Sequence, residues 1–150
     1  MFLAEQAAFI DLDESSIRAD VTTVQEFSTF YLSFKVPVPV QEGCTVLIQL
    51  PDDFILRAGD LTRVQGWGIF GRKTDLSFGI DESSRIIKIV DQCAYYSGAN
   101  TAAELEIEQF KNPKLVRTTK SFFIQVMDQN NQGVAELASG LVYDPTSGLM

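Results

Sequence analysis

The feature that most constrains this chain is an alternation of apolar residues followed by a turn near its C-terminus. Phe122, Ile124 and Val126 occupy every second position, a period of two that is typical of a strand with one buried face. Residues 128–133 (DQNNQG) are types that adopt left-handed backbone or bond their own main chain in turns. Residues 134–143 then predict a returning partner strand, so we expect a β-hairpin here.

The same alternation recurs along the chain, at residues 27–36, 44–50 and 103–107, and residues 86–90 form a short apolar run. Residues 8–13 and 16–23 alternate more weakly. Residues 56–78 and 92–101 are irregular and rich in glycine or polar residues, so we expect loops with short strands there. Helical periodicity is not sustained for three turns outside residues 1–9. This pattern predicts about seven to nine strands in an all-β, antiparallel sandwich or barrel.

Length and composition fit one globular domain covering residues 1–150. The 150 residues are enough for a single core, and 45% hydrophobic with 21% charged residues is ordinary globular usage. The chain has no histidine, which removes the commonest general base and the commonest metal ligand. A Gly-x-Ser-x-Gly nucleophile motif is also missing, and nothing among 20 acidic residues selects a catalytic pair. We therefore predict a protein that is not an enzyme.

The charge balance argues against some partners. A net charge of −8 disfavours nucleic acid and anionic membranes, because binding to phosphate needs a basic surface. The sequence contains no run of 18 apolar residues, so it predicts no membrane-spanning helix. The first eleven residues lack the basic and long apolar regions of a signal peptide. The sequence alone thus indicates either an intracellular protein or a mature or excised segment.

Cys44 and Cys93 are the only cysteines. A bridge between them would close a loop of about 50 residues and contribute about 4 kcal/mol in the chain-entropy model. Both lie in or beside apolar, strand-like runs, where a bridge between neighbouring strands or two buried free thiols would fit equally well. The sequence leaves the two alternatives open.

Two stretches resemble a known family of modules. Residues 37–54 read PVPVQEGCTVLIQLPDDF, in which proline and glycine precede an alternating strand that ends in proline and phenylalanine. Residues 105–107, 110–113 and 120–126 (LEI, FKNP, KSFFIQV) are followed by Asp128 and Gly133. This order is similar to that of immunoglobulin-like modules repeated in large surface glycoproteins of ciliates and algae, including mastigoneme-type (flagellar-hair) proteins. The resemblance covers residues 26–143 and its motifs are structural.

The resemblance implies an immunoglobulin-like sandwich that serves as an extracellular or cell-surface building block in tandem with other modules. The implied function is structural or adhesive: contacts with neighbouring modules or with copies of the same protein in a surface assembly or filament. Residues 37–40 or 1–23 would offer an edge for strand addition to a neighbour. The chain departs from a surface glycoprotein in lacking an Asn-x-Ser/Thr acceptor.

Two motifs imitate ligand sites. Residues 66–71 (GWGIFG) have the spacing of a dinucleotide-binding loop, but they lack the preceding buried strand and the following amphipathic helix. Asp128 and Asn130 imitate the start of a calcium loop whose closing glutamate is replaced by Ser139. We expect a glycine-bearing loop and a plain hairpin turn. Calcium stays a weak candidate cofactor, at Asp128 and Asn130 or at acidic residues 11–14 or 52–53 shared between modules.

Aromatic residues in the two irregular stretches suggest an alternative function. Trp67, Tyr95 and Tyr96 are expected in long loops, where they could form a platform for sugar rings or for a partner protein. The alternative reading is that these side chains cap the core, as large aromatic residues commonly do. A carbohydrate-binding sandwich is therefore the second hypothesis.

Overall fold

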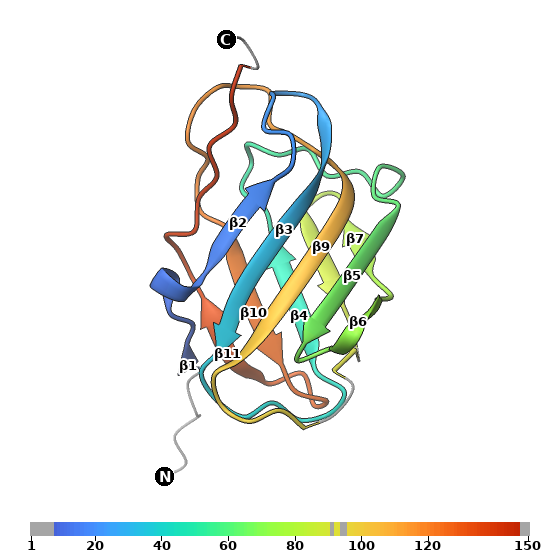
Figure 1. Ribbon diagram of the computed structural model, residues 1–150, viewed down its shortest axis with the longest axis vertical. Helices are drawn as coiled ribbons and strands as arrows, with labels where there is room; N and C mark the ends of the chain where they lie inside the picture. The colour runs from blue at the N-terminus through green and yellow to red at the C-terminus, as the bar shows by residue number, and fades with distance from the viewer. Residues whose placement is uncertain (1–7, 91, 94–95, 148–150) are drawn as a thin grey trace.

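The computed structural model describes residues 8–90, 92–93 and 96–147 and shows two β-sheets packed face to face (Figure 1). The first sheet has the order β1 (Ala8–Phe9), β11 (Gly133–Leu137), β10 (Phe123–Met127), β4 (Thr45–Gln49), β8 (Ile86–Ile89) and β7 (Gly79–Asp81). The second has the order β2 (Ser16–Ala19), β3 (Phe27–Val36), β9 (Thr101–Lys111), β5 (Arg63–Gly68) and β6 (Gly71–Asp75). A single 3₁₀ turn, η1 (Leu12–Glu14), joins β1 to β2.

The predicted all-β, antiparallel-rich sandwich is confirmed. Among the described strand pairs only β1 and β11 run parallel, and the others are antiparallel. Strand β3 spans the predicted residues 27–36, and β10 and β11 form the predicted hairpin. The returning strand ends at Leu137 and not at residue 143, because Gly140 takes a φ of +99°, which a regular strand does not allow.

The prediction of seven to nine strands was too low, since the described residues form eleven. The additional strands are short or irregular. Strands β1 and β7 contain two and three residues, and β5 with β6 builds a hairpin inside the stretch expected to be mostly loop. Alternation cannot be recognised over two or three residues, and glycines interrupt it in the hairpin.

The glycines of this hairpin explain the dinucleotide-like spacing. Gly68 has a φ of +81°, and a side chain there would overlap the carbonyl oxygen of Ala102 on β9. A side chain at Gly66 would lie 2.6 Å from Leu76 and 2.7 Å from Phe70. The glycines therefore allow a close approach of strands, and residues 66–71 form a strand turn and not a phosphate-binding loop.

The core contains an aromatic cluster around Phe54, whose side chain is almost fully buried. Its ring packs edge-on against Phe30, Phe110 and Phe122, with centroid distances of 6.2, 5.3 and 5.3 Å, and Tyr143 completes the cluster at 6.1 Å. Edge-to-face pairs of this kind stabilise beyond the area they bury. The cluster joins β3, β9, β10 and the segments after β4 and β11, so it locks both sheets together.

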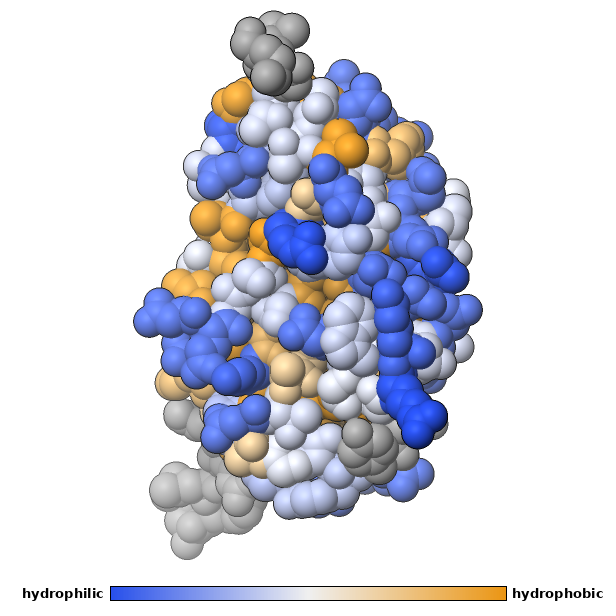
Figure 2. Space-filling view, viewed as in Figure 1, coloured by the Kyte–Doolittle hydropathy of each residue, from blue (hydrophilic) through white to orange (hydrophobic). Residues whose placement is uncertain are grey.

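The remaining surface is mixed. Figure 2 shows small hydrophobic patches separated by hydrophilic residues over the face formed by the second sheet. The described residues contain no helix long and apolar enough to cross a bilayer. Residues 37–40 do not form the free edge that was expected, because Val40 pairs with Ser97 in an antiparallel bridge. Residues 8–9 and 16–19 pair with β11 and β3, and they lie at the sheet edges.

Candidate functional site

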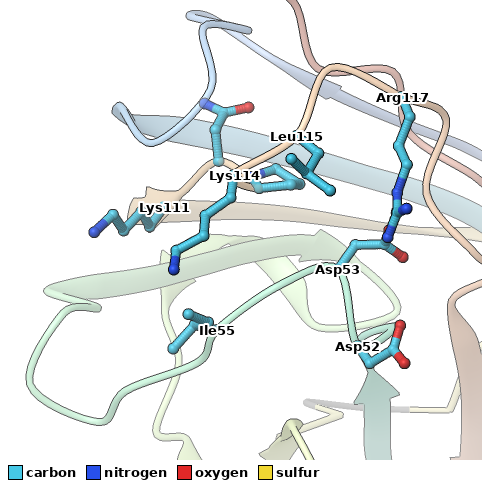
Figure 3. Close-up of a pocket in the computed structure, with 9 residues that line it drawn as sticks. Asp52, Asp53, Ile55, Lys111, Lys114, Leu115 and Arg117 are labelled. Atoms are coloured by element: carbon cyan, nitrogen blue, oxygen red, sulfur yellow. The ribbon is translucent and has the colours of Figure 1, made fainter.

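Several surface hollows lie at one end of the sandwich, around the segment after β4, and another lies beside Gly43 and Asn131 at the start of β4. We call the hollow between the segment after β4 and the segment after β9 the end groove. Its main lining residues are Asp52, Asp53, Ile55, Lys111, Lys114, Leu115 and Arg117 (Figure 3). It encloses about 270 Å³, slightly less than the roughly 300–1,000 Å³ typical of small-molecule sites. Its size suits one or two side chains of a partner.

Proline residues shape both walls of the end groove. Pro51 lies shortly after the end of β4, and Pro113 lies shortly after the end of β9. Neither proline has a backbone N–H that could donate a hydrogen bond to a neighbouring strand. Between them Asn112 is buried, and its amide donates to the carbonyl oxygens of Val21 and Glu26 at 2.8 and 3.0 Å. The segments after β4 and after β9 therefore leave their sheets at the same end of the sandwich, each in a fixed direction.

Asp53 joins the two walls. Its side chain is only 5% exposed and accepts a 2.9 Å hydrogen bond from the backbone N–H of Lys120. The guanidinium of Arg117 lies 3.4 Å from its other oxygen. Figure 3 shows Arg117 reaching down from the upper segment to Asp53. A hydrogen bond to a little-exposed carboxylate is stronger than a surface ion pair. The bond from the Lys120 N–H to Asp53 therefore holds the two walls of the groove together.

The groove exposes apolar side chains that a folded protein commonly buries. Ile55 is 50% exposed and Leu115 is 55% exposed, and they come from opposite walls. Val116, next to Leu115, is also exposed. Contiguous exposed apolar side chains with a polar rim are a mark of contact surfaces.

The charges around the groove oppose the charge of the whole chain. Residues 111–120 carry four lysines or arginines and no acidic residue, whereas the chain has a net charge of −8. Lys120 pairs with Asp52 at 3.2 Å. Neither Lys111 nor Lys114 has a carboxylate partner among the described residues; the Lys111 ammonium lies 5.6 Å from the ring centre of Phe27. The end groove thus presents two available cations beside apolar side chains.

The predicted aromatic platform is not assembled as expected. Trp67 lies on strand β5 and not in a loop, with its side chain half-buried and the ammonium of Lys73 5.2 Å from its ring centre. Tyr96 lies in the segment before β9 and is exposed. Tyr95 lies outside the described residues. Among the described rings, no contact joins Trp67 to Tyr96.

Trp67 belongs instead to a charged outer face of the second sheet. Strand β9 carries a row of three glutamates, and a side chain of another strand in the sheet contacts each of them. Glu104 accepts a 2.8 Å hydrogen bond from Ser33 on β3. Glu106 pairs with Lys73 on β6 at 3.2 Å, and Glu108 pairs with Arg63 on β5 at 2.6 Å. The hydrogen bond to Glu108 raises the pKa of Arg63. This face is saturated by its own cross-strand pairs.

The predicted calcium residues form a turn. The side chain of Asp128 accepts hydrogen bonds from the backbone N–H groups of Asn130 and Gln132, at 2.9 and 3.0 Å. Both bonds go to the same carboxylate oxygen, which is the usual arrangement of an aspartate that stabilises a turn. Among the described residues, no group of three or more acidic or cysteine side chains gathers in a way that could hold a metal ion.

The two cysteines lie together in the structure. Cys44 precedes β4, Cys93 follows β8, and a disulfide joins them with their Cα atoms 5.0 Å apart. Both side chains are buried. The bridge lies towards the end of the sandwich opposite the end groove, and it ties the segment containing Tyr96 to the first sheet.

The end groove was not among the sites predicted from sequence. Its walls are separated by more than fifty residues, and nothing in the pattern of either segment shows that they meet. One sequence signal was present: a run with four basic residues, no acidic residue and the pair Leu115-Val116, in an otherwise acidic chain.

Comparisons with known proteins define the fold class. No family model matches the sequence, and a search of curated proteins finds no match. The chain is a β-sandwich, and among solved structures it is similar in fold to a bacterial hydrophobin. The narrower likeness to ciliate and algal modules stays a prediction from sequence.

The particular structures are distant in sequence. The bacterial hydrophobin BslA is 14% identical with a TM-score of 0.51, covering 93% of this chain and 98% of that one. The collagen-binding domain of a Staphylococcus aureus adhesin is 12% identical with a TM-score of 0.45, covering 87% and 93%. A type II cohesin domain from the cellulosome of Acetivibrio cellulolyticus is 17% identical with a TM-score of 0.41, covering 85% and 90%. At these identities the likeness shows the fold alone.

Proposed function

We propose that this chain is a non-catalytic, extracellular structural or adhesive module that binds a neighbouring protein through the end groove. The observation that carries the proposal is the exposure of Ile55 and Leu115 beside the two available cations of Lys111 and Lys114. Apolar anchors with a charged rim are the usual anatomy of a protein interface. The disulfide supports an oxidising, extracellular setting, because such bridges persist outside the cytosol.

Mechanism here means surface complementarity. The partner supplies apolar side chains that cover Ile55 and Leu115, together with carboxylates that approach Lys111 and Lys114. The contact between Arg117 and Asp53 holds the two walls in one arrangement, so little conformational entropy is lost when the groove is filled. The same proposal places the module in tandem with other modules, in a filament or in a glycoprotein assembly.

Photo-crosslinking on intact cells tests this function. A photoreactive amino acid replaces Leu115 in the chain made by its own host, and the same amino acid replaces exposed Lys88 on β8 as the matched control. The proposal predicts a crosslinked protein adduct at position 115 that is absent at position 88. Equal labelling at both positions, or no adduct at either, would contradict it.

The second hypothesis, carbohydrate binding through Trp67, Tyr95 and Tyr96, has less support. Sugar rings stack on an open aromatic face, and Lys73 lies over the ring of Trp67. A glycan array probed with the wild-type chain and with Trp67→Ala decides this question. Binding that is lost in the variant would favour the sugar-binding function.

A further inference from the structure

We propose that the occupant of the end groove is a second copy of this chain, which contributes its residues 9–13. We call residues 9–13 the edge segment. This inference rests on the proposed function and names the partner. Copies would then join in a row, with the edge segment of one lying in the end groove of the next.

The edge segment exposes apolar groups to an unusual degree. Phe9, on the two-residue strand β1, is 77% exposed, and Leu12 is 41% exposed. Phe9 exposes more of its side chain than any other large apolar residue among those described. A phenylalanine left open at a sheet edge has a large surface to bury on contact.

The edge segment also carries carboxylates without counter-charges. Neither Asp11 nor Asp13 makes an ion pair among the described residues, whereas nearby Glu14 pairs with Lys35 at 2.7 Å. Asp11 caps η1 by accepting from the N–H of Asp13 at 3.0 Å, which holds the segment in one conformation. An interface would meet this segment already ordered, at a lower entropic cost.

The two surfaces complement each other group by group. The groove offers two available ammonium groups, at Lys111 and Lys114, with Ile55 and Leu115 between its walls. The edge segment offers two available carboxylates with Phe9 and Leu12 alternating among them. Opposite charges set the register and the rate of encounter, and the apolar side chains supply the attraction that persists in salt.

The positions of the two surfaces decide how copies can join. Figure 1 shows β1 at the lower left of the sandwich and η1 farther up on the same flank, whereas β4 and β9 run into the groove walls at the upper end. The edge segment therefore cannot fill the groove of its own chain. A contact between two different surfaces is heterologous, so each added copy leaves one groove and one segment free, and the row continues.

The groove's size sets the strength of the contact. A stable interface buries about 1,200–2,000 Å² in total, and a groove of about 270 Å³ holds only one or two side chains. We expect a weak contact, with association appearing between about 10 μM and about 1 mM at low salt. Tethered or crowded copies at a surface would strengthen it by raising the effective concentration.

Sedimentation of charge-reversed chains tests the inference. K111E/K114E alters the groove and D11K/D13K alters the edge segment. R72E/K88E is the matched control for the groove variant, because both side chains are exposed and unpaired among the described residues. It takes the net charge from −8 to −12, as K111E/K114E does, whereas D11K/D13K takes it to −4. Circular dichroism and thermal unfolding first establish that each variant is folded.

The expected result is specific. The wild type and R72E/K88E gain mass above 16.7 kDa with concentration at about 20 mM salt and lose most of that gain at about 500 mM. Each single-surface variant alone stays monomeric. A mixture of the two associates again into rows of alternating copies, because the intact segment of one fits the intact groove of the other and the two reversed surfaces are complementary as well. Combining all four changes in one chain restores association.

Other outcomes overturn the inference and separate it from the proposed function. A wild type that stays monomeric across the range, or a K111E/K114E variant that associates like the control, excludes self-docking. If the position-115 adduct described above then contains a different protein, the groove is an interaction surface for another partner, and only the self-docking inference fails. If no adduct forms, both fail.

Discussion

The hydroxyl of Tyr143 donates a 2.6 Å hydrogen bond to the side-chain oxygen of Asn112. Asn112 in turn donates to the carbonyl oxygens of Val21 and Glu26, so one buried pair joins the C-terminal segment, the end of β9 and the segment before β3. The same Asn112 stands at the base of the end groove. Core packing and groove geometry are thus connected through a single side chain.

The hydrogen bond between Tyr143 and Asn112 predicts that the folded protein loses stability at alkaline pH. Burial raises the pKa of Tyr143 from 10.0 to about 12, and its side chain is only 4% exposed. Because the pKa of Tyr143 is higher in the folded state than in the unfolded state, its contribution to the free energy of unfolding is complete below pH 10. That contribution is lost as the pH rises towards 12. We expect the free energy of unfolding to fall by about 2–3 kcal/mol across this range.

Chemical denaturation at several pH values between 8 and 12 checks this prediction. Tyr143→Phe should be destabilised at neutral pH by about 1–2 kcal/mol, because Asn112 loses its partner, and should lose much of the alkaline slope. Tyr31→Phe is the control, since this half-buried tyrosine has a pKa raised mainly by its hydrogen bond to Asp20. An unchanged slope in Tyr143→Phe would contradict the assignment.

The disulfide predicts a large dependence on oxidation. Because Cys44 and Cys93 close a loop with a sequence separation of 49, reduction should lower the free energy of unfolding by about 3–4 kcal/mol. The C44A/C93A variant should behave like the reduced wild type. Mass spectrometry without reductant gives an independent check: two free thiols in protein secreted by its host would contradict the bridge.

The aromatic cluster predicts a contrast between two phenylalanines. Phe54→Ala removes the ring that packs against Phe30, Phe110 and Phe122, and should cost about 3–5 kcal/mol. Phe9→Ala should change the free energy of unfolding by less than about 0.5 kcal/mol, because Phe9 is exposed. Equal losses in the two variants would show that the core is placed wrongly.

The Asp128 turn predicts indifference to calcium. Since its side chain already accepts from two backbone N–H groups, millimolar calcium should leave the thermal midpoint unchanged, whereas ligand binding would raise it. Asp128→Ala should destabilise the hairpin by about 1–2 kcal/mol. A calcium-dependent rise in midpoint that Asp128→Ala abolishes would instead establish a metal site.

The long strands could be predicted from sequence because one of their faces is buried throughout. In β3, Phe30, Leu32, Phe34 and Val36 are all buried and their neighbours are not, so the period of two appears directly in the residues. The β5–β6 hairpin was missed because Gly66 and Gly68 replace side chains where strands approach closely. Trp67 was therefore expected in a loop.

The end groove could not be predicted because it depends on contacts between distant segments. Asp53 is expected from the sequence in an acidic turn, yet its side chain is little exposed, accepts a hydrogen bond from the backbone N–H of Lys120 and forms an ion pair with Arg117. Leu115 reads as one more apolar residue, and only the fold shows that it stays exposed opposite Ile55. Local periodicity reports which face a side chain takes, but it does not report which other segment lies there.

The central claim is that the end groove of this sandwich binds the edge segment of the next copy. An NMR concentration series on the ¹⁵N-labelled wild-type chain tests it most directly. As concentration rises at low salt, the amide signals of residues 9–13 and of residues 53–55 and 111–117 should shift together, while those of the outer face of β9 stay fixed. Signals that do not move, or that move only outside these two surfaces, would contradict the claim.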